Sequence, residues 1–100
     1  MHIISAKTID DFASQHPTAK ASLNSWLKIV SKTRFSNFNE LRASFPSADV
    51  VKNAKGDNLT VFNIHGNGIR LIAAIHYNRN KLYIRHILTH SEYDKEKWKT

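Results

Sequence analysis

The stretch LTVFNIHGNGIRLIAAIHYNRNKLYIRHILT, residues 59–89, contains three apolar runs separated by short polar segments. β-Branched and aromatic side chains are frequent in the runs, and Gly and Asn gather between them, which is the pattern of strands joined by tight turns. Strands joined in this way form an antiparallel meander. We predict strands over 59–65, 70–77 and 82–89, turns at 66–68 and 78–80, and a short preceding strand over 50–52.

The first half of the chain has the pattern of helices. In the segment from Thr18 to about Lys32, apolar residues recur at i, i+3, i+4 and i+7, which predicts a helix with one face against a sheet. These residues are Leu23, Trp26, Leu27 and Val30. Asn37 followed by Glu40 is typical of a second helix start, and Pro46 ends that helix.

The two ends of the chain complete the predicted fold. Residues 1–5 contain two isoleucines and predict a short opening strand, while the polar residues 90–98 fit a short helix or an ordered tail. A chain of 100 residues and 11.5 kDa holds one core, so we expect a single domain over 1–100. The predicted class is α+β, with N-terminal helices packed on a small twisted antiparallel sheet.

Charge is the most informative feature of the composition. Fifteen Lys and Arg residues against eight Asp and Glu give a net charge of +7, and residues 51–100 hold nine of the fifteen. Such an excess favours a polyanionic partner, namely nucleic acid, an anionic membrane surface or an acidic protein, although it also serves solubility alone. The chain has no cysteine, signal-peptide pattern or long apolar run, so we expect a cytoplasmic protein that is not inserted in a membrane.

The usual cofactor and metal patterns are missing from the sequence. Residues 66–68 lack the helix and lysine of a phosphate-binding loop. His86 and His90 are four residues apart but straddle a predicted strand end, which is a poor zinc site. We therefore expect neither a metal nor another cofactor.

Four side chains near the last predicted strands have the chemistry of phosphodiester cleavage: Arg70, Arg85, His90 and Tyr93. Arginine binds phosphate and stabilises the charge that develops on its oxygens, and histidine transfers protons near neutral pH. RNA supplies its own nucleophile in the 2′-hydroxyl group. Simpler readings remain open, because the arginines could pair with Asp49, Asp57 or Glu92, and His90 could cap a strand end.

The sequence resembles the HigB toxins of the RelE/ParE superfamily of toxin–antitoxin systems. The resemblance extends over nearly the whole chain and is most specific in Thr89-His90-Ser91-Glu92-Tyr93-Asp94, supported by Arg70-Leu71-Ile72. It implies a microbial-ribonuclease-like domain that cleaves mRNA without metal, often in the ribosomal A site. It also implies inhibition by a HigA-type helix-turn-helix antitoxin, with operator DNA bound only through the antitoxin complex.

The same resemblance implies roles for individual residues. Arg70 matches a strand arginine that contacts the scissile phosphate, and Arg85 a second basic residue facing it. His90 matches a general acid or base, in competition with His65, His76 and His86, and Tyr93 an aromatic residue near the substrate base. Lys52 fits a basic position used for RNA, and we expect Lys55 and Arg79 to bind RNA with it. Two alternatives are a non-catalytic basic RNA-binding module and an inactive relative that only binds antitoxin.

Overall fold

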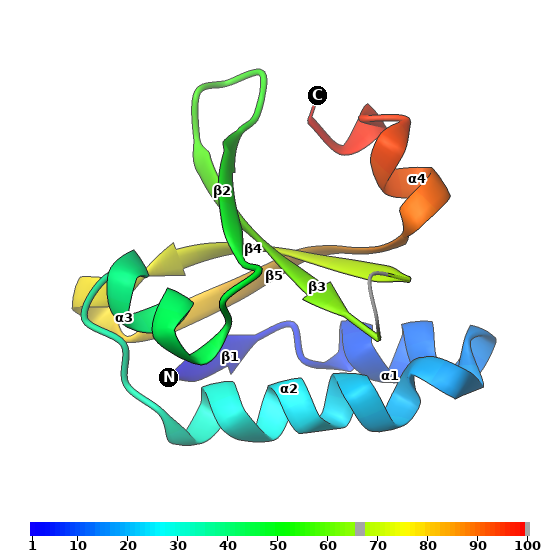
Figure 1. Cartoon of the computed structure of the whole chain (residues 1–100), viewed down its shortest axis with the longest axis horizontal. Helices are drawn as coiled ribbons and strands as arrows, with labels where there is room; N and C mark the ends of the chain where they lie inside the picture. The colour runs from blue at the N-terminus through cyan, green and yellow to red at the C-terminus, as the bar shows by residue number, and fades with distance from the viewer. Residues whose placement is uncertain (66–67, 100) are drawn as a thin grey trace.

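A five-stranded sheet forms the centre of the fold, with strand order β1-β5-β4-β3-β2 (Figure 1). The computed structural model describes residues 1–65 and 68–99. The strands are β1 (His2–Ile4), β2 (Asp49–Lys52), β3 (Asn58–Ile64), β4 (Ile69–His76) and β5 (Lys81–Thr89). The helices are α1 (Lys7–Gln15), α2 (Lys20–Lys32), α3 (Phe38–Ser44) and α4 (His90–Asp94), with short 3₁₀ turns at Pro17–Ala19, Tyr77–Arg79 and Lys97–Lys99.

Strands β2 to β5 form the predicted antiparallel meander. Asn80 closes the β4–β5 turn with φ 56°, a left-handed conformation that asparagine tolerates better than most residues. Gly66 and Asn67, predicted as part of the β3–β4 turn, lie outside the described residues. The prediction of an antiparallel sheet is wrong for β1, because this strand pairs in parallel with β5. The sheet is therefore mixed. The α+β class is confirmed.

Helices α1 and α2 cover one face of the sheet (Figure 1). Leu23, Trp26 and Val30 of α2 are buried, as the helical period predicts, and pack in a common core with side chains of β3, β4 and β5. The predicted start of α3 is also confirmed, because the Asn37 side chain accepts a hydrogen bond from the Glu40 amide at 2.9 Å. This core fixes the sheet, and the sheet positions the side chains on its other face.

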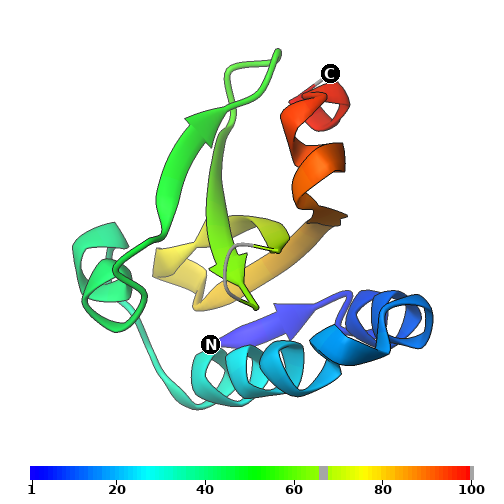
Figure 2. The same cartoon turned by 45° about the vertical axis from the view of Figure 1, so that its right-hand side comes forward.

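The opposite face of the sheet is covered by the C-terminal segment, α4 and the turn at Lys97–Lys99 (Figure 2). Trp98, which is 6% exposed, packs there in a second apolar cluster with Leu59, Val61 and Ile72. The Ala54 amide donates to the Lys99 carbonyl at 2.7 Å, which attaches the end of the chain to the β2–β3 hairpin. Over the described residues, the helices are too short or too polar to cross a membrane.

Candidate functional site

Helix α4 starts directly at the end of β5 because Thr89 and Glu92 form a capping box. The Glu92 amide donates to the Thr89 hydroxyl at 3.3 Å, and Glu92 Oε1 accepts from the Thr89 amide at 2.9 Å. The hydrogen bonds from the Thr89 backbone and hydroxyl lower the pKa of Glu92 below its ordinary value. Glu92, one of the acidic partners considered for the arginines, is thus engaged in holding α4 in place.

His90 and Asp94 face one another across one turn of α4. The Nδ1 atom of His90 lies 2.9 Å from Oδ2 of Asp94, and both side chains are more than half exposed, at 56% and 61%. A carboxylate accepting from Nδ1–H leaves Nε2 of a neutral imidazole as the proton acceptor. The pair therefore has the arrangement of an oriented general base.

Arg70 lies near the start of β4, on the face that α4 covers. Its position is half-buried, opposite Leu88 in the β4–β5 ladder. The guanidinium carbon lies 5.5 Å from the centre of the Tyr93 ring, a cation–π contact, and Nη1 donates to the Ile69 carbonyl at 3.5 Å. The His90 amide donates to the Gly68 carbonyl at 3.1 Å, so the start of α4 is tied to the strand just before Arg70.

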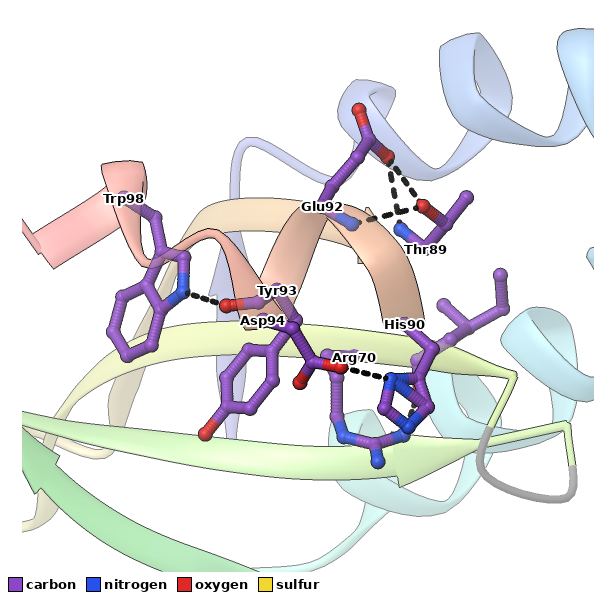
Figure 3. Close-up of polar contacts among 8 residues, drawn as sticks. Arg70, Thr89, His90, Glu92, Tyr93, Asp94 and Trp98 are labelled. Atoms are coloured by element: carbon purple, nitrogen blue, oxygen red, sulfur yellow. Dashed lines mark hydrogen bonds and ion pairs between the residues drawn. The ribbon is translucent and has the colours of Figure 1, made fainter.

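Tyr93 is held from the other side by Trp98. The two rings are stacked with centroids 5.1 Å apart and planes inclined by 14°, and Trp98 Nε1 donates to the Tyr93 carbonyl at 3.0 Å. In Figure 3 the Tyr93 ring lies between Trp98 and Arg70, and the Asp94 carboxylate reaches from above Tyr93 toward the His90 ring beside Arg70. We refer to Arg70, Tyr93, His90 and Asp94 as the Arg70 site.

Arg85 lies apart from the Arg70 site. The β4–β5 register shifts so that Ile72 faces His86 and Ala73 faces Ile84, which makes Arg85 the extra residue of a β-bulge. It is exposed and lines a small polar cavity with residues of the β2–β3 hairpin, among them Lys55. The structure thus brings together three of the four predicted catalytic residues, whereas the fourth, Arg85, lines a separate cavity with Lys55 and Trp98.

A cavity of about 390 Å³ lies next to the small polar cavity that Arg85 and Lys55 line. It is lined by His86, Leu88, Glu92, Lys95, Lys97 and Trp98. Burial lowers the pKa of His86 below its ordinary value of 6.5, and the positive charge of Arg85 adds to the effect. His86 is therefore neutral at neutral pH and can donate or accept a hydrogen bond there.

The three predicted RNA-binding residues lie at different places. Lys55 is exposed in the β2–β3 turn beside Arg85. Lys52 pairs with Asn58, and strand alternation directs both away from the face that holds Arg70. Arg79 lies in the turn after β4, about 20 Å along the sheet from Arg70 at the usual rise per residue.

The competing histidines each have other surroundings. His65 follows β3, and its Nδ1 lies 3.3 Å from the Ser22 hydroxyl of α2. His76, at the far end of β4, packs edge-on against Tyr83. His86 pairs with Ile72 of β4 and lines the cavity of about 390 Å³ together with Trp98. Of the histidines considered, His90 is the one that lies in α4 with Tyr93, and its amide donates to the carbonyl of Gly68, two residues before Arg70.

Two residues of this region were missed by the analysis of the sequence alone. Asp94 belongs to the quoted Thr89–Asp94 segment, and its i, i+4 spacing from His90 would have indicated the pair once a helix was assumed. Trp98 lies in the segment that the sequence predicts as a short helix or an ordered tail, and its contact with Tyr93 depends on the turn between them. Among residues 1–65 and 68–99, no three His, Asp or Glu side chains are grouped to hold a metal ion.

Comparisons with known proteins agree on one family. A family described as HigB_toxin, the RelE-like toxic component of a toxin–antitoxin system, matches residues 19–96. The chain is 37% identical over 94 residues to the mRNA interferase toxin HigB of Escherichia coli strain K12, covering 94% of this chain and 88% of that protein. It is 34% identical over 95 residues to the mRNA interferase HigB of Escherichia coli O6:H1, covering 95% and 90%.

Proposed function

The chain belongs to the HigB family of RelE-like toxins of toxin–antitoxin systems, and on that premise we propose that it is an endoribonuclease that cleaves mRNA. The observation that carries the proposal is the Arg70 site, where a guanidinium, an oriented imidazole and a phenol gather at one end of the sheet. These groups supply phosphate binding and proton transfer, which are the two requirements for cleaving RNA through its own 2′-hydroxyl.

In the proposed reaction, Nε2 of His90 takes the proton of the 2′-hydroxyl. The 2′ oxygen forms a bond to the adjacent phosphorus, the bond from phosphorus to the 5′ oxygen breaks, and that oxygen takes a proton from solvent. The products are a 2′,3′-cyclic phosphate and a 5′-hydroxyl end. Asp94 keeps the imidazole in the required tautomer and stabilises the positive charge that it gains. No metal ion is needed to generate the nucleophile.

Arg70 binds the scissile phosphate in this proposal. A guanidinium can donate two parallel hydrogen bonds to phosphate oxygens and stabilise their developing charge. Its contact with the Tyr93 ring holds it beside α4 before RNA binds, which reduces the cost of organising the site. The Tyr93 ring is already in contact with Trp98 and with the Arg70 guanidinium. Its hydroxyl and ring edge are therefore the parts that we propose contact the substrate.

We propose that the basic residues around the two cavities beside Trp98 form a track for the RNA. Arg85 and Lys55 line one cavity, and Lys95 and Lys97 line the neighbouring one. These charges suit the phosphates that flank the cleaved bond. Lys52 and Arg79 lie outside this track, and we propose that they contact RNA only within a larger assembly.

That assembly is the translating ribosome, with the mRNA cut in the A site. We further propose that the toxin acts in the cytoplasm and is inhibited by a HigA-type helix-turn-helix antitoxin, through which alone it reaches operator DNA. The family's description as the toxic component of a toxin–antitoxin system supports a protein inhibitor. A net charge of +7 favours an acidic contact surface on that inhibitor.

The test is cleavage of a defined mRNA by purified protein, with and without translating ribosomes, and with cut sites mapped by primer extension. We expect Arg70→Ala to lower transition-state stabilisation by roughly 2.7–4 kcal/mol, the range found when one oxyanion donor is removed. Free RNA is also tested in EDTA. Absence of cleavage under both conditions by folded wild-type protein would reject the enzyme and leave a non-catalytic RNA-binding module or an antitoxin-binding relative.

A further inference from the structure

We propose that Trp98 is a positioning residue for the ribonuclease reaction, acting on Arg70 through the ring of Tyr93. The inference rests on the proposed function for its kinetic part, whereas the contacts that carry it can be tested independently. It assigns to the C-terminal turn a role in aligning the phosphate-binding group.

A continuous row of contacts connects Trp98 to the phosphate-binding group. The indole is stacked on the Tyr93 ring at 5.1 Å, and the same ring meets the Arg70 guanidinium at 5.5 Å. The row comes from three separate parts of the chain, namely β4, α4 and the turn at Lys97–Lys99. A displacement of the indole therefore moves the surface against which Arg70 rests (Figure 3).

Trp98 itself is immobilised by three kinds of contact, and the next residue is tied down as well. Its ring is buried against the second apolar cluster, on Leu59, Val61 and Ile72. Its Nε1 donates to the Tyr93 carbonyl at 3.0 Å. Lys99 Nζ lies 5.5 Å from the centre of its ring. The Lys99 carbonyl accepts from Ala54, which ties the following residue to the β2–β3 hairpin.

The contact of Trp98 with Tyr93 differs from an ordinary core contact in its geometry. Trp98 has a planar face that matches the Tyr93 ring at an angle of 14°, and a donor that reaches the Tyr93 backbone. Another apolar side chain could fill the same space, but it would hold the ring without fixing its plane. Misplacing a reacting group by about 1 Å can cost about 100-fold in rate, so a small rotation of Tyr93 is sufficient for a large effect.

The experiment compares Trp98→Phe, Trp98→Met and Val61→Ala. Phenylalanine keeps a ring that can stack, methionine keeps a large apolar cover without a ring, and Val61→Ala weakens the same cluster at a residue outside the row. We expect Trp98→Met to lower kcat at least about tenfold while KM changes less than about threefold. Trp98→Phe should recover most of kcat, and Val61→Ala should leave it within about twofold when measured below its melting temperature.

A spectroscopic readout separates positioning from stability. In the wild-type protein, the Arg70 Nε–H proton should be shifted upfield by the Tyr93 ring current, and the shift should be lost in Trp98→Met and kept in Val61→Ala. An unshifted Arg70 resonance in the wild type would overturn the proposal even if the Trp98 variants did not fold. Equal losses of kcat in Trp98→Met and Val61→Ala would overturn it as well. If the wild type does not cleave RNA, the proposed function fails, while the resonance still reports on the row of contacts.

Discussion

Nδ1 of His90 lies 2.9 Å from Oδ2 of Asp94, one helical turn further along α4. A carboxylate at Nδ1 favours the neutral tautomer in which Nε2 is the proton acceptor, which is the arrangement that the proposed general base requires. The start of α4 is in turn anchored by the hydrogen bond from the His90 amide to the carbonyl of Gly68, the residue just before β4. His90 and Arg70, the groups proposed to transfer the proton and to bind the phosphate, are therefore held next to one another in the fold.

The first prediction concerns this pair. His90→Gln should lower kcat about 100-fold or more, because general-base catalysis typically contributes that much. Asp94→Asn should have a smaller effect, about tenfold, since the imidazole stays in place but loses its carboxylate. Single-turnover cleavage of the same RNA measures both. A folded His90→Gln protein with the wild-type rate would assign the base to another group.

The second prediction concerns the start of α4. Thr89→Ala should lower the free energy of unfolding by about 1 kcal/mol, because the Glu92 amide loses its capping hydroxyl. Thr89→Ser keeps the hydroxyl and serves as the matched control. Denaturant unfolding measures the difference at pH 7. The difference should shrink at acidic pH, as Glu92 is protonated on passing down through its lowered pKa. A difference that persists unchanged at pH 3 would contradict this role for the carboxylate.

The third prediction follows from the lowered pKa of His86. The unfolded chain binds a proton at this residue more readily than the folded chain, so acidification favours unfolding. Stability linked to His86 should be complete above its unfolded pKa of about 6.5 and should fall as the pH decreases from there toward its lower folded pKa. His86→Gln should reduce the loss of unfolding free energy between pH 7.5 and 5.5. An equally steep loss in the variant would show that another group is responsible.

The fourth prediction separates the RNA track from the cleaving group. Lys55→Ala and Arg85→Ala should raise KM with little change in kcat, and each should reduce the salt dependence of binding by about 0.7 in a plot of log K against log salt. Lys52→Ala, on the other face of the sheet, is the control for free RNA and should leave both quantities close to wild type. Titrations at several salt concentrations give the slopes. If the wild type and the three variants gave equal salt slopes, the proposed RNA track would be rejected.

Much of the fold could be predicted from local patterns. The four strands of the meander follow from apolar runs and turn residues, and α2 follows from the spacing of Leu23, Trp26 and Val30. The parallel pairing of β1 with β5 could not, because it joins residues about 80 positions apart and has no local signal.

The site could be predicted in part. Residues 90–98 fit a short helix, in which the three-residue spacing of His90 and Tyr93 predicts a shared face, and the structure places both residues in α4. Arg85 was grouped with them because strand alternation alone does not reveal the bulge that separates it from Arg70. The stack of Trp98 on Tyr93 depends on a turn whose residues Glu96 and Lys97 carry no apolar pattern.

The most direct test of the central claim uses an RNA with a single 2′-deoxy nucleotide on the 5′ side of the mapped cut, assayed in EDTA if free RNA is cleaved and on translating ribosomes otherwise. We predict that this substitution abolishes cleavage at that bond, and that the unmodified RNA gives a 2′,3′-cyclic phosphate and a 5′-hydroxyl end. Cleavage of the deoxy-substituted bond at the normal rate, or products with a 5′-phosphate, would contradict a reaction in which His90 activates the substrate's own hydroxyl beside Arg70.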